Sequence, residues 1–182
     1  MRLFIGIEFP ERVIAALAAA QSELRGNSVR GRFKRRENFH LTLKFLGEVP
    51  SADVALLTAP LTAVAAAAGP FAIGLGKVGQ FGSGSPVRTV WVDAAGDLGR
   101  LQDLQGRVEQ ALVPLGFPAE RRPWRPHVTL AQDVVPVPAA PPWSAYQVDD
   151  RPFTVTEYAL ILSEEIDHRR LYTPIARFPL QG

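Results

Sequence analysis

The sequence of 182 residues contains no cysteine, so it can form neither a disulfide framework nor a thiolate metal site. No run approaches the roughly 20 apolar residues that a membrane-spanning helix needs. The apolar start is interrupted by Glu8 and Pro10 before the core of a signal peptide could develop. A lack of cysteine is also compatible with a reducing compartment. We therefore expect a cytoplasmic protein that does not enter a membrane.

The sequence also lacks a large excess of either charge, because 20 basic and 18 acidic residues leave a net charge of only +2. The basic residues are nevertheless clustered before two of the three histidines: Arg25, Arg30, Arg32, Lys34, Arg35 and Arg36 before His40, and Arg121, Arg122 and Arg125 before His127. Basic clusters near a site favour a polyanionic ligand. Taken alone, the clusters are more simply interpreted as two solvated loops.

Apolar residues make up 47% of the chain, which is typical of a globular protein with a real core. The periodic spacing of apolar residues and the positions of turn-forming residues predict alternating strands and helices. The expected strands cover 2–9, 39–46, 71–79, 87–93, 127–131, 153–162 and 171–180, and the expected helices cover 10–26, 51–68 and 97–115. Residues 134–152 form a proline-rich connection. Pro60 should kink or divide the second helix.

A tetrapeptide of one pattern occurs once in each half of the chain. His40-Leu41-Thr42-Leu43 returns as His127-Val128-Thr129-Leu130, 127 − 40 = 87 residues later. In a strand, side chains two residues apart point the same way, so each copy presents an imidazole beside a hydroxyl. The repeat predicts an α+β fold of two similar lobes, with antiparallel sheets that face a shared central cleft.

Two imidazoles suit phosphoester chemistry, because a histidine pKa of about 6.5 lets one ring accept a proton while the other donates one. The hydroxyls of Thr42 and Thr129 can donate to the phosphate oxygens on which charge develops. Lys44 lies on the same predicted strand face as His40 and could add positive charge. We therefore expect no cofactor and no metal.

The chain resembles the 2H phosphoesterase superfamily, and within it the RNA 2′,3′-cyclic phosphodiesterases that are also called 2′-5′ RNA ligases. The likeness covers nearly all of the sequence. It includes Arg2-Leu3-Phe4-Ile5-Gly6-Ile7, His40-Leu41-Thr42-Leu43-Lys44-Phe45-Leu46-Gly47, Arg125-Pro126-His127-Val128-Thr129-Leu130-Ala131, and the region of Leu162-Ser163 and Tyr172.

The resemblance implies one bilobal domain over residues 1–182 with pseudo-twofold symmetry. It also implies hydrolysis of a terminal 2′,3′-cyclic phosphate to a 2′-phosphate, and some relatives join RNA ends in the reverse direction. We assign His127 as the base for water and His40 as the acid, although the residues also permit exchanged roles. Relatives often carry an arginine where this chain has Gln132, so we expect Arg125 or Lys44 to bind the phosphate instead.

Other patterns have simpler explanations. The glycine pattern of 74–79 leads into a turn rather than a helix, so it is not expected to bind a dinucleotide. His168 lies in a charged turn and should be exposed. Trp143 and Tyr146 could stack on a base, but the simpler interpretation is that they hold a loop to the surface.

Three functions remain open from the sequence. The first is a monomeric enzyme that acts on RNA ends without an obligate protein partner. The second is a non-catalytic RNA- or nucleotide-binding module. The third is an enzyme for a small nucleotide cyclic phosphate or a 2′-5′-linked oligonucleotide.

Overall fold

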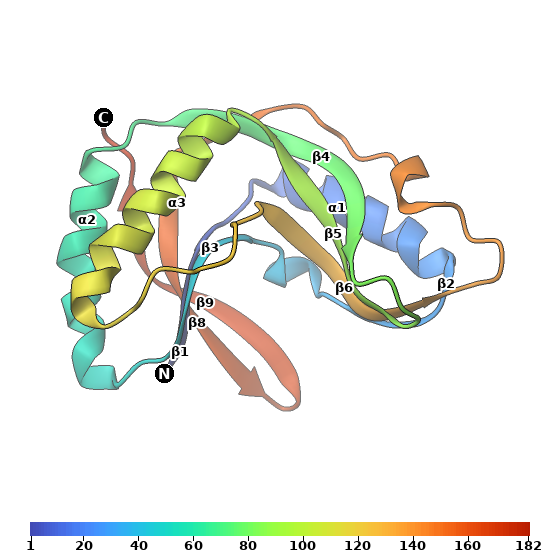
Figure 1. Ribbon diagram of the computed structural model, residues 1–182, viewed down its shortest axis with the longest axis horizontal. Coiled ribbons are helices and arrows are strands. Elements are labelled where there is room, and N and C mark those ends of the chain that lie inside the picture. Colours follow the sequence, from blue (N-terminus) through green and yellow to red (C-terminus); the bar gives the residue numbers. More distant parts are fainter.

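Two antiparallel sheets form the centre of the protein in the computed structural model, which describes all 182 residues (Figure 1). The four-stranded sheet has the order β3 (Leu41–Glu48), β1 (Arg2–Ile7), β8 (Glu157–Ile166) and β9 (Arg169–Pro179). The five-stranded sheet has the order β2 (Ser28–Phe33), β6 (His127–Pro136), β5 (Val87–Gly96), β4 (Phe71–Phe81) and β7 (Phe153–Val155). The predicted α+β class with antiparallel sheets is confirmed.

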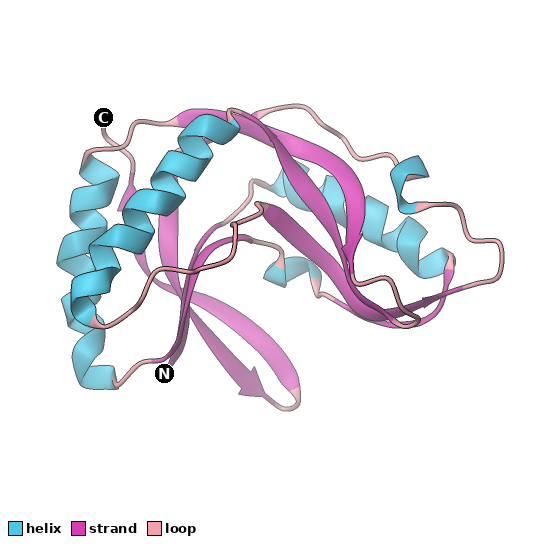
Figure 2. Cartoon of the chain, viewed as in Figure 1, coloured by secondary structure: helices cyan, strands magenta, loops and turns pink.

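The three α-helices lie toward the two ends of the molecule (Figure 2). Helix α1 (Glu11–Gly26) contacts β2 and β6 of the five-stranded sheet, whereas α2 (Thr58–Ala66) contacts β9 and α3 (Leu98–Leu112) contacts β3 of the four-stranded sheet. Short 3-10 helices cover Arg36–Asn38, Ser51–Leu57, Val113–Leu115 and Trp143–Ala145. Each sheet therefore has helical cover of its own.

The chain passes several times from one sheet to the other, so the lobes do not coincide with the halves of the sequence. Strand β1 belongs to the four-stranded sheet, α1 and β2 to the other lobe, and β3 to the four-stranded sheet again. One hydrophobic core of 39 buried residues draws on both lobes. The two lobes are therefore parts of one packed unit.

Some boundaries differ from those that the sequence predicts. Strand β2 was not predicted, because Ser28–Phe33 is short and its three polar residues alternate with only two apolar side chains and a glycine. It forms by pairing with β6, which continues past residue 131 to Pro136. Pro60 lies in the first turn of α2, where a backbone N–H has no partner within the helix, so it is tolerated there.

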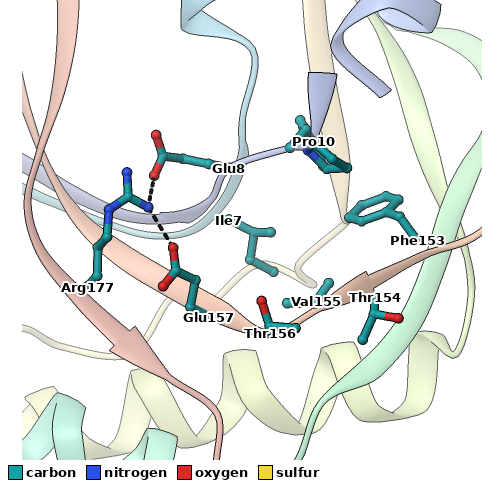
Figure 3. A pocket seen from close by; sticks show the side chains of 10 residues that line it. Ile7, Glu8, Pro10, Phe153, Thr154, Val155, Thr156, Glu157 and Arg177 are labelled. Atoms are coloured by element: carbon teal, nitrogen blue, oxygen red, sulfur yellow. Dashed lines mark hydrogen bonds and ion pairs between the residues drawn. The ribbon is translucent and has the colours of Figure 1, made fainter. Parts of the chain in front are cut away.

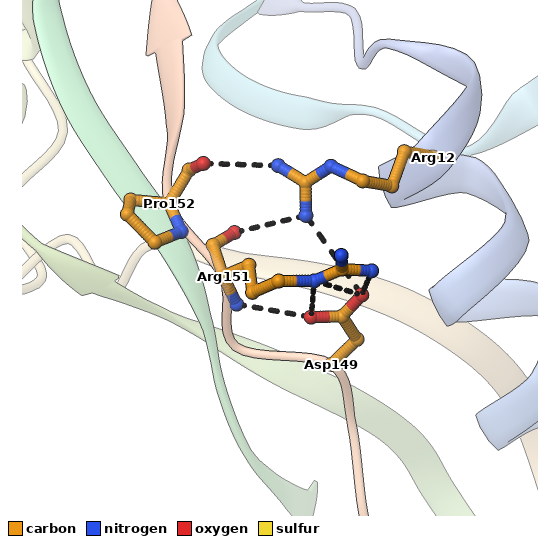
Figure 4. Close-up of polar contacts among 4 residues, drawn as sticks. All are labelled: Arg12, Asp149, Arg151 and Pro152. Carbon is orange, nitrogen blue, oxygen red and sulfur yellow. Dashed lines mark hydrogen bonds and ion pairs between the residues drawn. The ribbon is translucent and has the colours of Figure 1, made fainter.

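The proline-rich connection is held against the lobe of the five-stranded sheet. Trp143 donates its indole N–H to the Gln80 side chain, and Tyr146 is buried, so the interpretation that they fix a loop is confirmed. Arg12 of α1 donates to the carbonyls of Arg151 (3.2 Å) and Pro152 (2.9 Å) (Figure 4). These contacts join the connection to α1.

None of the helices has the length and apolar character required to pass through a lipid bilayer.

Candidate functional site

The two repeated motifs lie on neighbouring strands from different sheets. His40 immediately precedes β3, His127 begins β6, and the two strands contact each other. The Trp124 indole N–H donates to the Thr42 carbonyl at 3.2 Å, which connects the segment before the second motif to the first motif strand. Positive charge on His127 lowers the pKa of His40. The two motifs therefore lie on contacting segments of different sheets.

Both imidazole rings are oriented by the same backbone contact. His40 Nδ1 lies 2.8 Å from the Asn38 carbonyl, and His127 Nδ1 lies 2.8 Å from the Arg125 carbonyl, in each case two residues earlier. A carbonyl only accepts hydrogen bonds, so Nδ1 carries the proton and Nε2 of the neutral ring is the acceptor. The Thr42 hydroxyl lies 2.9 Å from His40 Nε2 and donates to it. His127 Nε2 thus stays free for proton transfer, whereas His40 Nε2 becomes available once the Thr42 hydroxyl turns away from it.

Both motif strands also contain a β-bulge at the fourth residue of the motif. In the pairing of β1 with β3, Gly6 and Ile5 face Thr42 and Lys44, which leaves Leu43 as the extra residue. In the pairing of β5 with β6, the corresponding extra residue is Leu130. A bulge breaks the alternation of a strand, so the residue after it changes face. The two motifs therefore repeat in local structure as well as in sequence.

The first bulge corrects the expectation for Lys44. The Lys44 side chain turns inward, where Nζ donates to Glu109 Oε2 at 2.5 Å and to the Pro118 carbonyl at 2.9 Å. Both partners of this ion pair are buried, with side-chain exposures of 5% and 8%. Phe45, the next residue, is 72% exposed. Lys44 has no free charge to offer a phosphate.

Arg125 lies beside the second motif, but its charge is already paired. Its guanidinium donates to both carboxylate oxygens of Asp93, at 3.2 and 3.0 Å, and lies 4.1 Å above the Trp91 ring. Asp93 faces His127 across the β5–β6 pair. Thr129 is half-buried two residues after His127. Arg125 could therefore contact an anion only while sharing its charge with Asp93.

Aromatic rings surround both imidazoles, an arrangement that was not predicted from the sequence. Phe4 and Tyr172 lie 4.6 and 5.0 Å from the His40 ring. Phe81 and Trp91 lie 5.0 and 6.2 Å from the His127 ring. Trp91 also packs over Gly79, where a Cβ atom would overlap its ring. These rings come from different strands of both sheets, and no single stretch of sequence signals the cluster.

Burial lowers the pKa of both histidines. The pKa of His40 falls to about 4, because desolvation and the positive charges of Lys34 and His127 outweigh the favourable Asn38 carbonyl. Desolvation also lowers the pKa of His127, while the Arg125 carbonyl and Asp93 oppose that shift. Both rings are therefore neutral at pH 7 in the free protein.

The remaining candidates lie apart from this pair. A cavity of about 350 Å³ opens near the end of β1 and is lined by both sheets, with Arg177 bound to Glu8 and Glu157 at 2.6 and 2.7 Å (Figure 3). It contains no histidine. Residues 74–79 lie within β4, and His168 is exposed in the turn between β8 and β9, as predicted. No cluster of three or more His, Asp or Glu side chains has the geometry to hold a metal ion.

The sequence matches the model of the 2'-5' RNA ligase superfamily over residues 9–167, and the chain belongs to that superfamily. Curated relatives include an RNA 2′,3′-cyclic phosphodiesterase of Thermus thermophilus, 33% identical over 100% of this chain and 91% of the relative. The protein of the same name from Geobacillus stearothermophilus is 33% identical over 80% of this chain. The match spans 46% of the Geobacillus protein's length.

Solved structures agree over the whole chain. A crystal structure of a Thermus thermophilus protein has a TM-score of 0.85 and 30% identity, with 100% of this chain and 99% of that chain covered. Escherichia coli LigT complexed with 3′-AMP has a TM-score of 0.80 and 26% identity, with 100% and 98% covered.

Proposed function

We propose that this protein is an RNA 2′,3′-cyclic phosphodiesterase that hydrolyses a terminal 2′,3′-cyclic phosphate to a 2′-phosphate. The observation that carries the proposal is the matched presentation of His40 and His127, each fixed through Nδ1 by the carbonyl two residues earlier at 2.8 Å. The names of the relatives and the 3′-AMP complex of LigT support a nucleotide end as the ligand.

The proposed reaction uses the two Nε2 atoms on opposite sides of one phosphorus atom. His127 accepts a proton from water, which attacks phosphorus, and His40 donates a proton to the departing ribose 3′-oxygen. Each transfer contributes roughly 10²- to 10⁴-fold to the rate. The hydroxyls of Thr42 and Thr129 donate to the non-bridging oxygens as negative charge develops there. The same sequence of steps, with a ribose 5′-hydroxyl in place of water as the nucleophile, joins two RNA ends through a 2′-5′ linkage.

The proposed acid must gain its proton when the substrate binds. His40 is neutral in the free protein, because its pKa is about 4. The negative charge of the cyclic phosphate favours the imidazolium form and raises this pKa. Substrate binding and protonation of His40 are therefore coupled.

A product analysis tests the proposed function. The protein is incubated, in excess chelator, with an oligonucleotide that ends in a 2′,3′-cyclic phosphate, and the terminal isomer is identified. We expect a 2′-phosphate from the wild type, and a loss of turnover in His40→Ala and in His127→Ala. A 3′-phosphate product would overturn the assignment of the leaving group. Binding without any turnover would favour the non-catalytic module.

A sulfur-bridged substrate tests the two roles separately. When sulfur replaces the 3′ bridging oxygen, the leaving group departs without a proton. His40→Ala should then recover most of its turnover, whereas His127→Ala should not. Recovery in His127→Ala alone would show that His127 is the acid and His40 the base.

The proposal extends to the surroundings of the enzyme. We place the reaction in the cytoplasm and expect a monomer to perform it without a protein partner. Turnover by purified protein at a concentration where light scattering gives the mass of one chain would agree with this expectation. A requirement for a second protein would contradict it.

A further inference from the structure

Lys34 is fixed to the lobe that carries the second motif. It directly follows β2, and its backbone N–H donates to the Leu130 carbonyl at 2.8 Å. The Gln21 side-chain amide donates to the Lys34 carbonyl at 2.8 Å and to the Leu130 carbonyl at 2.7 Å. The Lys34 backbone is therefore fixed beside Leu130, the residue after Thr129.

The side chain of Lys34 extends toward the other lobe. Its Nζ lies 5.9 Å from the centre of the Tyr172 ring, and that ring lies 5.0 Å from the His40 ring. Tyr172 belongs to β9 of the four-stranded sheet. Lys34 thus projects an ammonium group from the lobe of His127 toward the surroundings of His40.

The charge of Lys34 has no acidic partner, unlike those of its neighbours. Arg32 pairs with Asp133, Arg35 with Glu37, and Arg36 with Glu11. No carboxylate oxygen lies within 4.0 Å of Lys34 Nζ, and the side chain is half-buried. Burial, followed by the charges of Arg170 and Arg32, lowers the pKa of Lys34. A partly desolvated cation among other cations is unfavourable until an anion binds.

The other basic residues expected at the site are already occupied. Lys44 is buried with Glu109, and Arg125 shares its charge with Asp93. Gln132, which follows the second motif on β6, is uncharged. A phosphate between His40 and His127 would therefore meet the unpaired ammonium of Lys34, which extends from the lobe of one motif toward the other.

We propose that Lys34 binds the phosphate group of the substrate, in the place first assigned to Lys44 and Arg125. This inference rests on the proposed function for the identity of the substrate, but not for the binding of phosphate itself. The ammonium donates to a non-bridging oxygen, and the negative charge offsets the cost of its burial.

The test uses Lys34→Met, Lys34→Arg, and the control Lys77→Met, which removes the exposed lysine of β4 and the same unit of charge. Binding of inorganic phosphate is measured by calorimetry, and turnover is measured on the cyclic-phosphate oligonucleotide. Lys34→Met should weaken phosphate binding and raise KM, each by roughly 10- to 100-fold. Lys34→Arg should recover most of the loss, and Lys77→Met should change either value less than about twofold.

Two results would overturn the inference. One is phosphate binding that Lys34→Met leaves unchanged, and the other is an equal loss in Lys77→Met, which would indicate an effect of net charge. The binding measurement also separates this inference from the proposed function. If the wild type binds phosphate through Lys34 but opens no cyclic phosphate, the proposed function fails and the role of Lys34 stands.

Discussion

At the scale of single residues, the two imidazoles are chemically alike but differ in their surroundings. Both keep Nδ1 protonated toward a carbonyl, and burial lowers the pKa of both. The positive charge of Lys34 lowers the pKa of His40, whereas the negative charge of Asp93 raises the pKa of His127. Groups whose environments differ in this way can take different roles in one proton-transfer reaction.

These shifts predict an acidic optimum for kcat/KM. Catalysis needs one neutral and one protonated imidazole, and the singly protonated pair is most abundant between the two pKa values of the free protein. Both values lie below the ordinary histidine pKa of about 6.5, and that of His40 is about 4. The pH profile of kcat/KM should therefore peak below about 6.5. In Lys34→Met the peak should move to higher pH, because a positive charge near His40 is removed.

The measurement is a series of kcat/KM values from about pH 4 to about pH 9 at constant ionic strength, which spans the range where histidines titrate. A peak above about pH 7, or one that Lys34→Met moves to lower pH, would contradict the assigned electrostatics.

At the scale of the elements, the bulge in β3 determines which side chains after the first motif point into the core and which point to solvent. The sequence predicted Lys44 on the same strand face as His40, and this prediction is wrong because Leu43 adds one residue to the strand. A bulge leaves no reliable mark on the sequence of one strand. The pairing partner, β1, determines it.

The buried ion pair between β3 and α3 predicts a structural role for Lys44. Removal of one partner leaves an uncompensated buried charge, so Lys44→Met should lower the free energy of unfolding by about 3 kcal/mol or more. The folded variant should keep kcat/KM within about threefold of the wild type, because Lys44 makes no contact with phosphate. Urea unfolding and kinetics at a permissive temperature measure the two effects.

The double variant Lys44→Met with Glu109→Leu is the control, since it removes both charges and should recover most of the stability. If it remains folded but loses turnover, Lys44 belongs to the binding site after all. The opposite pattern is expected for Lys34→Met, which should lose phosphate affinity but little stability.

The sequence predicted most elements because their apolar periods are strong, as in residues 39–46 and 97–115. It missed β2, a six-residue strand that pairs with β6 and whose alternation includes only two apolar side chains. It predicted His40, His127 and their threonines as the site from the repeated spacing, and that assignment stays a prediction. It named Lys34 only as one of several basic residues before His40, and it did not predict the aromatic rings around the imidazoles, since strand pairing within each sheet brings those rings together.

At the scale of the whole molecule, the interleaved path of the chain holds the two motifs together. Strands β1 and β3 belong to one lobe, while α1 and β2 between them belong to the other. Neither lobe is a continuous segment of the chain. The lobes therefore cannot separate without disrupting the hydrophobic core that they share. Two motifs can contact one phosphate at the same time only if their relative positions are fixed.

The central claim is that His40 and His127 act as one unit on a single phosphorus atom. Its most direct test is the turnover of His40→Ala, His127→Ala and the double variant on the cyclic-phosphate oligonucleotide in excess chelator. Residues that act as a unit are strongly non-additive, so the double variant should be little slower than the slower single variant, each single loss being roughly 10²- to 10⁴-fold. Losses that multiply in the double variant, or turnover that survives either replacement, would contradict the account.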